Sequence, residues 1–408
     1  MGGRIMASTI NSSTSNGIVI TPDTSGEIEL QANGVTKAKV TANGLQDANG
    51  NSLRGGMYRN LIINGDMNVS QRATQVTGVT TSGYRTVDRH QPRFSSCGTW
   101  TIDTDTDVPT GQGFAKSLKY TCTTADASPA STDYAIYTYV FEGQHLQHIK
   151  KGTSNAESLT LSFWVKSNVT GTYMVELIDN DNGRQVSKGF SVSASGTWEK
   201  KTLTFPPDTT GALDNDNNGS FEINIWFAVG SSRSSGTASG SWATAVDANR
   251  AAGQTANLAS ATSNYLNITG LQLEVGSGAS DFEFLPYDVQ LARCQRYAYK
   301  LGGEISSYYA DSAGGYWDAN YIGFGKIRFP VPMRAAPSAT FTTGGGINVW
   351  RGNTTYTGFS WNITISGNPT TRDCFIVGNK TSHGVTVDAG AMIKFEDTAA
   401  NCLFSAEL

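Results

Sequence analysis

The sequence predicts an all-β protein: an extended N-terminal anchoring segment, an antiparallel β-sandwich of the jelly-roll type, a short linking helix and a smaller C-terminal β domain. Three observations support this prediction. Apolar residues alternate with polar ones in many short segments, which is the pattern of half-buried strands. Turns rich in glycine, asparagine and aspartate separate these segments, and glycine makes up 45 of the 408 residues. One stretch has helical spacing, and strands without helices between them are typical of sandwiches and jelly rolls.

The overall composition argues against several kinds of binding partner. The 408 residues suffice for two or three domains, each with its own core. A net charge of −4 and an isoelectric point near 5.6 argue against nucleic acid as a ligand, because nucleic-acid binding needs clustered lysine and arginine. The five cysteines are scattered without metal or redox spacing, which predicts free buried thiols. No apolar run reaches the roughly 18 residues of a membrane span, so we expect no membrane insertion.

Residues 1–56 predict a segment that becomes ordered only against partners. Its apolar side chains are few and small, and those expected to make the anchoring contacts are Ile18, Ile20, Ile28, Leu30 and Val40. Six or seven such residues at roughly 1.5 to 3 kcal/mol each cannot offset backbone ordering at about 1 to 2 kcal/mol per residue. Either three copies wrap round one another, or the segment docks on a larger assembly; the sequence permits both.

Residues 57–287 predict the jelly roll. Its opening, residues 59–72 (RNLIINGDMNVSQR), has a short buried strand over residues 61–63 and then Asn64-Gly65, the pair best able to form a two-residue β-turn. The clearest strands are residues 158–167 (SLTLSFWVKS) and 221–229 (FEINIWFAV), with apolar residues at every second position. Residues 229–264, rich in small and polar residues, predict an exposed loop.

The helical stretch spans residues 288–301 (DVQLARCQRYAYKL). Leu291, Cys294, Ala298 and Leu301 fall at helical intervals, and Pro286 lies shortly before the expected helix start. Residues 302–408 return to strand patterns, which predicts the second β domain. The three prolines of residues 330–338 (PVPMRAAPS) exclude a central strand there.

Aromatic residues are the candidates for a ligand site. Sugars stack on flat aromatic faces flanked by amide and carboxylate groups. Trp164 and Trp226 alternate with the core-facing residues of their strands, so their indoles are expected on the outer face of a sheet. The alternative is that they pack beneath the 229–264 loop or against a neighbouring chain. Further candidates, expected in loops, are Trp100, Trp242, Tyr316 and Trp317.

Three acidic loops offer the oxygen ligands that calcium prefers. Asp214, Asp216 and Asn218 match the start of an EF-hand loop, although Ile225 stands where the bidentate glutamate belongs. The other two loops contain Asp103, Asp105 and Asp107, and Asp179 and Asp181. Ordinary turns are the alternative for each loop, because aspartate and asparagine build turns readily.

Neither metal catalysis nor a nucleophile is indicated. His145 and His148 form a spaced pair, but no third ligand is suggested nearby, so ordinary surface or core roles are expected. A nucleophile elbow, a Cys/His pair and a placed carboxylate dyad are all lacking. We therefore expect a binding protein rather than an enzyme, with no cofactor apart from the calcium option.

Several segments resemble bacteriophage fibre and receptor-binding proteins. These are residues 60–72 (NLIINGDMNVSQR), 268–300 (ITGLQLEVGSGASDFEFLPYDVQLARCQRYAYK), 330–338 (PVPMRAAPS) and 404–408 (FSAEL). The middle domain is similar to carbohydrate-binding jelly rolls through residues 159–167 (LTLSFWVKS) and 196–207 (GTWEKKTLTFPP). Jelly rolls that bind sugars often contain a structural calcium, and this resemblance is what keeps the calcium option open.

The resemblance implies a homotrimeric tail fibre or receptor-binding protein of the virion, assembled in the bacterial host cytoplasm. Its N-terminus would attach to other virion proteins of the tail, neck or capsid, and its β domains would meet host-surface glycans. The alternative is a capsid fibre or decoration protein built from the same modules. A third reading is a polysaccharide depolymerase, but such phage enzymes usually resemble long parallel β-helices, and no solenoid repeat is visible here.

Overall fold

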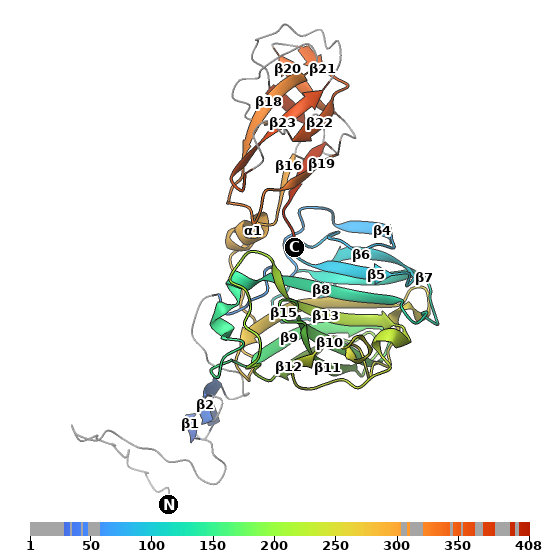
Figure 1. Ribbon diagram of the computed structural model, residues 1–408, viewed down its shortest axis with the longest axis vertical. Helices are drawn as coiled ribbons and strands as arrows, with labels where there is room; N and C mark the ends of the chain where they lie inside the picture. Colours follow the sequence, from blue (N-terminus) through green and yellow to red (C-terminus); the bar gives the residue numbers. More distant parts are fainter. Residues whose placement is uncertain are drawn as a thin grey trace, which may run out of the picture.

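The computed structural model describes residues 28–32, 35–41, 44–47, 58–302, 308–310, 321–342, 346–351, 354–363, 370–379, 392–395 and 400–408. In this part of the chain the fold is mostly β with one short α-helix, as expected from the sequence. Figure 1 shows the sandwich in the middle, a second β region beyond the helix and a small N-terminal sheet on the other side. None of the described helices is long and apolar enough to cross a membrane.

The sandwich consists of two six-stranded sheets in which neighbouring strands pair antiparallel. In spatial order the first sheet contains β14 (Ala243–Thr244), β11 (Arg184–Val192), β10 (Gly171–Asp179), β13 (Gly219–Val229), β8 (Tyr134–Glu142) and β5 (Gln91–Ser95). The second contains β12 (Glu199–Phe205), β9 (Leu159–Ser167), β15 (Tyr265–Val275), β7 (Ser117–Thr124), β6 (Thr99–Asp105) and β4 (Gln75–Val79). We call them the β13 sheet and the β15 sheet.

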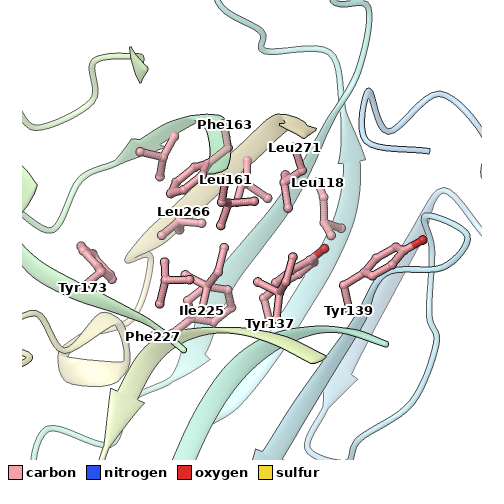
Figure 2. Packing of buried hydrophobic residues seen from close by; sticks show 14 of the residues in the cluster. Leu118, Tyr137, Tyr139, Leu161, Phe163, Tyr173, Ile225, Phe227, Leu266 and Leu271 are labelled. Atoms are coloured by element: carbon pink, nitrogen blue, oxygen red, sulfur yellow. The ribbon is translucent and has the colours of Figure 1, made fainter. Parts of the chain in front are cut away.

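The core of the sandwich follows the alternation seen in the sequence. Leu161 and Phe163 of β9 and Ile225 and Phe227 of β13 are all fully buried. Figure 2 shows these side chains pointing toward one another between the two sheets. Burial of each such side chain contributes about 1.5 to 3 kcal/mol, so the inward faces account for most of the stabilisation of the sandwich. All five cysteines are free and buried, as predicted.

The predicted hairpin at residues 59–72 is wrong, because no strand forms there. Asn64 does adopt a positive φ of 62°, and its carbonyl accepts a hydrogen bond from the Met67 N–H at 3.0 Å, so a turn forms without flanking strands. The Asn64 side-chain amide donates to the carbonyls of Val69 and Asp88 at 2.8 and 3.0 Å. Gly65 is required for a different reason: a Cβ there would lie 2.1 Å from the carbonyl oxygen of Leu271. The segment is thus an irregular, buried stretch that packs against β15.

The linking helix is shorter than predicted. Helix α1 spans Tyr287–Gln295 and buries Cys294, whereas Ala298 and Leu301 belong to strand β16 (Ala298–Gly302). Both residues are buried because β16 pairs with β25 (Asn401–Ser405), so their apolar spacing reflects a strand that happens to match a helical interval.

The C-terminal region contains three small antiparallel sheets among the described residues. In the first sheet, β25 lies between β16 and β19 (Ser338–Thr342). The strand order of the second sheet is β17 (Tyr308–Ala310), β24 (Met392–Phe395), β20 (Ile347–Arg351) and β21 (Thr354–Tyr356). The strand order of the third sheet is β18 (Tyr321–Arg328), β23 (Asp373–Asn379) and β22 (Ser360–Ile363). Residues 330–337 form no strand, as their prolines predicted.

A buried ion-pair junction joins the last residues of the chain to the sandwich. Arg72 Nη2 lies 3.0 Å from the Glu407 carboxylate, and Arg89, which is 1% exposed, donates to the other carboxylate oxygen. Arg334 donates to the backbone carbonyls of Ala406 at 2.7 Å and Asn217 at 2.8 Å. The two β regions are therefore held together by buried charges rather than by a free linker.

The N-terminal sheet has two unlike faces. Its strands are β1 (Ile28–Ala32), β2 (Val35–Thr41) and β3 (Gly44–Asp47). The pairs Ile28↔Val40, Leu30↔Ala38 and Val40↔Leu45 put their apolar side chains on one face. On the other face Glu29 pairs with Lys39, with an Nζ to Oε1 distance of 3.1 Å.

Candidate functional site

Among the tryptophan candidates that the structure describes, Trp164 on the outer face of the β15 sheet is the one that keeps an accessible indole on a strand. Strand β9 turns Phe163 and Val165 inward, so Trp164 between them faces outward and is half-buried. Its strand partners are Lys200 on β12 and Thr269 on β15. Trp164 therefore lies on a strand that is paired on both sides, with a polar neighbour on each side.

A second indole, which the sequence reasoning missed, belongs to the same face. The Asp107 carboxylate accepts hydrogen bonds from Trp198 Nε1 at 2.9 Å and from Lys166 Nζ at 2.6 Å. Partial burial alone would raise the pKa of Asp107, but these two hydrogen bonds hold it below its ordinary value. The signal was present in residues 196–207, because Trp198 stands two positions before the outward-facing Lys200.

We call this surface the Trp164 face; its residues are Trp164, Lys166, Trp198, Lys200 and Asp107. Aromatic rings offer apolar faces to sugar C–H groups. The carboxylate can accept hydrogen bonds from sugar hydroxyls, and the ammonium groups can donate hydrogen bonds to them. The arrangement suits an uncharged or weakly charged sugar.

Trp226 also faces outward, but it packs beneath the 229–264 loop, which was the alternative expectation. Its ring is therefore not accessible for stacking on a sugar. It is 0% exposed and packs with Ala251 and Ala238 of the 229–264 loop. The Arg250 guanidinium lies 5.3 Å from the ring centroid, and Arg250 also bonds Glu176 at 2.9 and 3.0 Å. The loop, expected to be exposed, thus covers Trp226 on this outer face.

The other tryptophan candidates are structural in their placement. Trp100 lies in strand β6 rather than in a loop; it is fully buried, stacks on Phe94 at 5.5 Å and donates from Nε1 to the Cys97 carbonyl. Trp242 is half-buried, and its Nε1 donates to the Pro206 carbonyl at 3.0 Å while its ring packs on Phe221. Tyr316 and Trp317 lie outside the described residues.

The calcium candidates form hydrogen-bonded turns. The Asp216 carboxylate accepts from the backbone N–H and the side-chain amide of Asn218 at 2.9 and 2.5 Å, and the Asp214 backbone N–H donates to Asp181. Asp179 pairs with Lys151 at 2.5 Å. Asp103 and Asp105 bond Gln75 and Lys119, at 2.5 and 3.1 Å. Within the described ranges no three His, Cys, Asp or Glu side chains gather as metal ligands, so the calcium site stays a prediction.

The histidine pair lies on two 3-10 turns, η1 (Gly143–His145) and η2 (Gln147–Ile149). His145 and His148 border a hollow of about 280 Å³ together with Tyr58 and Arg293. Burial lowers the pKa of both imidazoles, which are therefore neutral near pH 7.

Three of the five expected anchoring residues lie in the N-terminal sheet. Ile28, Leu30 and Val40 share the apolar face of the N-terminal sheet with Ala38 and Leu45. Leu30, Val40 and Leu45 are 49%, 40% and 45% exposed, respectively. Ile18 and Ile20 lie outside the described residues.

Comparison with known proteins gives only distant similarities. No protein-family model and no curated protein matches the chain. Among solved structures, the chain is similar to the enzymatically active domain of tailspike protein 4 of bacteriophage CBA120, with 14% identity, a TM-score of 0.28, and coverage of 54% of this chain and 22% of that one. The chain thus spans about a fifth of the length of that tailspike domain.

Carbohydrate-binding modules are similar at the same level. A CBM4 module matches with 11% identity and a TM-score of 0.26 over 52% of this chain and 97% of its own. TmCBM61, solved with β-1,4-galactotriose, matches with 8% identity and a TM-score of 0.27 over 53% of this chain and 99% of its own. These likenesses concern the β-sandwich fold, and the functional reasoning below rests on the residues of this chain instead.

Proposed function

We propose that this chain is a bacteriophage virion fibre protein that forms a homotrimer, attaches to other virion proteins through its N-terminal segment and presents its β domains to host-surface glycans. It acts by binding and not by cleaving its ligand. Support comes from the fibre-like segments at residues 60–72, 268–300, 330–338 and 404–408 and from the two surfaces described above.

The observation that carries the proposal is the apolar face of the N-terminal sheet. Leu30, Val40 and Leu45 remain 40% to 49% exposed on a sheet of only three short strands. Such a sheet is marginal in water by itself, because each fully buried Leu or Val contributes about 1.5 to 3 kcal/mol and this face buries little. Three copies packed face to face would cover it, and the charged face with Glu29 and Lys39 would stay in water.

Trimerisation also explains how a shallow sugar surface would hold a particle. The Trp164 face has two half-buried indoles on the outer face of a sheet, and we expect each copy to bind weakly by itself. Three linked copies convert the second and third contacts into intramolecular events, so overall avidity exceeds the affinity of one site by orders of magnitude, about 10² to 10⁴.

The test is the mass of the full chain in solution, measured by light scattering after gel filtration. We expect about three times the 43.4 kDa of one chain for the wild type and for Lys37→Glu, the control on the polar face. Leu30→Lys combined with Val40→Lys places two charges on the apolar face and should give the monomer mass. A monomeric wild type, or a double variant that stays trimeric, would overturn the proposal.

A further inference from the structure

Two hollows border helix α1, and a third adjoins the second of them. The first, about 280 Å³, is bordered by Tyr58, His145, His148, Arg293 and Arg296. The second, about 550 Å³, shares Tyr58, Arg293 and Arg296 with the first and adds apolar walls from Val289 and Pro332. The third, about 400 Å³, shares Pro332 with the second and is bordered by Arg328 and Arg372. Shared walls mean that the hollows follow one another from the sandwich to the C-terminal region.

Arginine is the residue type that these hollows have in common. Of Arg293, Arg296, Arg328 and Arg372, only Arg296 has a carboxylate partner among the ion pairs of the described residues: Glu142, at 3.0 and 2.7 Å. Asp373 borders the third hollow but pairs with Lys326 at 2.9 Å. The chain as a whole carries a charge of −4, so this local positive excess is not a general property of its surface.

Arg293 is the residue that most clearly lacks a ligand. Its Nη1 is buried and has no hydrogen-bond partner in the described structure. Its guanidinium lies 5.7 Å from the centroid of the Tyr58 ring, and Tyr58 itself is 52% exposed. A buried donor of a charged group without an acceptor is costly, and an anionic ligand would supply the acceptor.

We propose that these hollows bind an acidic glycan, whose anionic groups bond Arg293 and, farther along the chain of sugars, Arg328 and Arg372. A guanidinium pairs with a carboxylate or a phosphate through two parallel hydrogen bonds, and both groups occur on acidic polysaccharides. The Tyr58 ring offers a face for one sugar ring, and the neutral imidazoles of His145 and His148 offer N–H donors for hydroxyls. This inference rests on the proposed adhesion to host glycans and names a ligand class for it.

A glycan fits the hollows better than a nucleic acid does. Single-stranded nucleic acids bind where successive aromatic rings stack on successive bases along a basic groove. Here Tyr58 is the one exposed Phe, Tyr or Trp side chain among the residues that border the three hollows, and the walls between the arginines are Val289, Ala292, Val331 and Pro332. Apolar walls of this kind suit the methyl, acetyl and C–H surfaces of sugars.

The experiment is affinity electrophoresis of the full chain in native gels that contain polygalacturonate, a phosphomannan, neutral dextran or oligo-dT. We expect retardation by at least one acidic polysaccharide and not by dextran; polygalacturonate or phosphomannan then identifies carboxylate or phosphate as the anion. Arg293→Gln and the double variant Arg328→Gln/Arg372→Gln should each weaken binding about tenfold or more. Arg328 and Arg372 are exposed, so the double variant tests the site even if Arg293→Gln folds poorly.

Arg233→Gln is the matched control, because that guanidinium also lies over a tyrosine ring, 4.6 Å from the Tyr134 centroid, but on the loop over the β13 sheet. It should bind like the wild type. Retardation by dextran that is lost in the same arginine variants, no retardation by either acidic polymer, an equal loss in Arg233→Gln, or oligo-dT binding that is lost in the same variants would each overturn the inference. The solution mass of the same samples reports separately on the trimer.

Discussion

The buried junction between Glu407 and the sandwich makes a quantitative prediction for Glu407→Gln. Four charged groups meet there: the guanidinium groups of Arg72 and Arg89 and the carboxylates of Asp88 and Glu407, whose side chains are all 7% exposed or less. Their formal charges sum to zero, and the substitution leaves a net buried charge of +1. Breaking a buried pair by removing one partner typically costs about 3 to 5 kcal/mol.

The structure places the expected loss at the lower end of that range. Arg72 retains Asp88 at 3.0 Å, and Arg89 retains the Val140 carbonyl at 2.7 Å and the Tyr297 ring at 3.6 Å. A glutamine also keeps one acceptor oxygen but turns an N–H₂ toward the second arginine. We therefore expect Glu407→Gln to lower the free energy of unfolding by about 3 kcal/mol, out of the 5 to 15 typical of a domain.

Urea denaturation followed by tryptophan fluorescence measures this loss. Glu222→Gln is the control: Glu222 also forms a two-hydrogen-bond pair, with Arg93 at 2.8 and 3.0 Å, but Arg93 is 30% exposed, so a loss of about 1 kcal/mol or less is expected. If Glu407→Gln lost no more than Glu222→Gln, the claim that buried charge holds the two β regions together would be wrong.

Two further predictions concern the sandwich. Trp164→Ala should lose binding to neutral glycans on an array with little change in stability, whereas Trp226→Ala should lose about 3 to 5 kcal/mol of stability and keep binding, because its indole is fully buried; the reverse pattern would remove Trp164 from the site. Burial lowers the pKa of His90 from 6.5 to about 3, so the stability that depends on its neutral form is lost as the pH falls from 6.5 through 3. The difference in free energy of unfolding between wild type and His90→Gln should therefore shrink by about 3 kcal/mol between pH 7 and pH 4. A difference that stays the same at both pH values in urea denaturation would contradict this. Burial raises the pKa of Asp88 to about 6, which acts in the opposite direction, but this contribution is common to both proteins and cancels in the difference.

The sequence predicted the strands well because two-residue alternation reports directly on burial. It put Trp164 and Trp226 on outer faces correctly and offered packing beneath the 229–264 loop as the alternative, yet it could not show that Ala251 and Arg250 of this loop cover Trp226 and not Trp164. That cover depends on tertiary contacts, which leave no period in the sequence.

The errors at Asn64-Gly65 and in the linking helix have a common origin. Asn64 and Gly65 were interpreted through local turn preference, whereas the structure uses them for contacts with Asp88 and Leu271 far along the chain. Ala298 and Leu301 matched a helical interval by coincidence, because pairing with β25 decided their conformation. Arg293 and Arg296 lie at the end of α1, whereas Arg328 and Arg372 come from two other segments, so no linear motif could have indicated that all four border neighbouring hollows.

The pairing of Arg72 and Arg89 with Glu407 has a consequence for the order of events on the ribosome. These arginines are synthesised more than three hundred residues before their shared counter-ion, with sequence separations of 335 and 318. Until Glu407 has left the ribosome, a sandwich with its strands already paired would carry Arg89 against Tyr297 and Val140 without that carboxylate. A nascent chain should thus gain its full resistance to unfolding in a late step, after both β regions have been made.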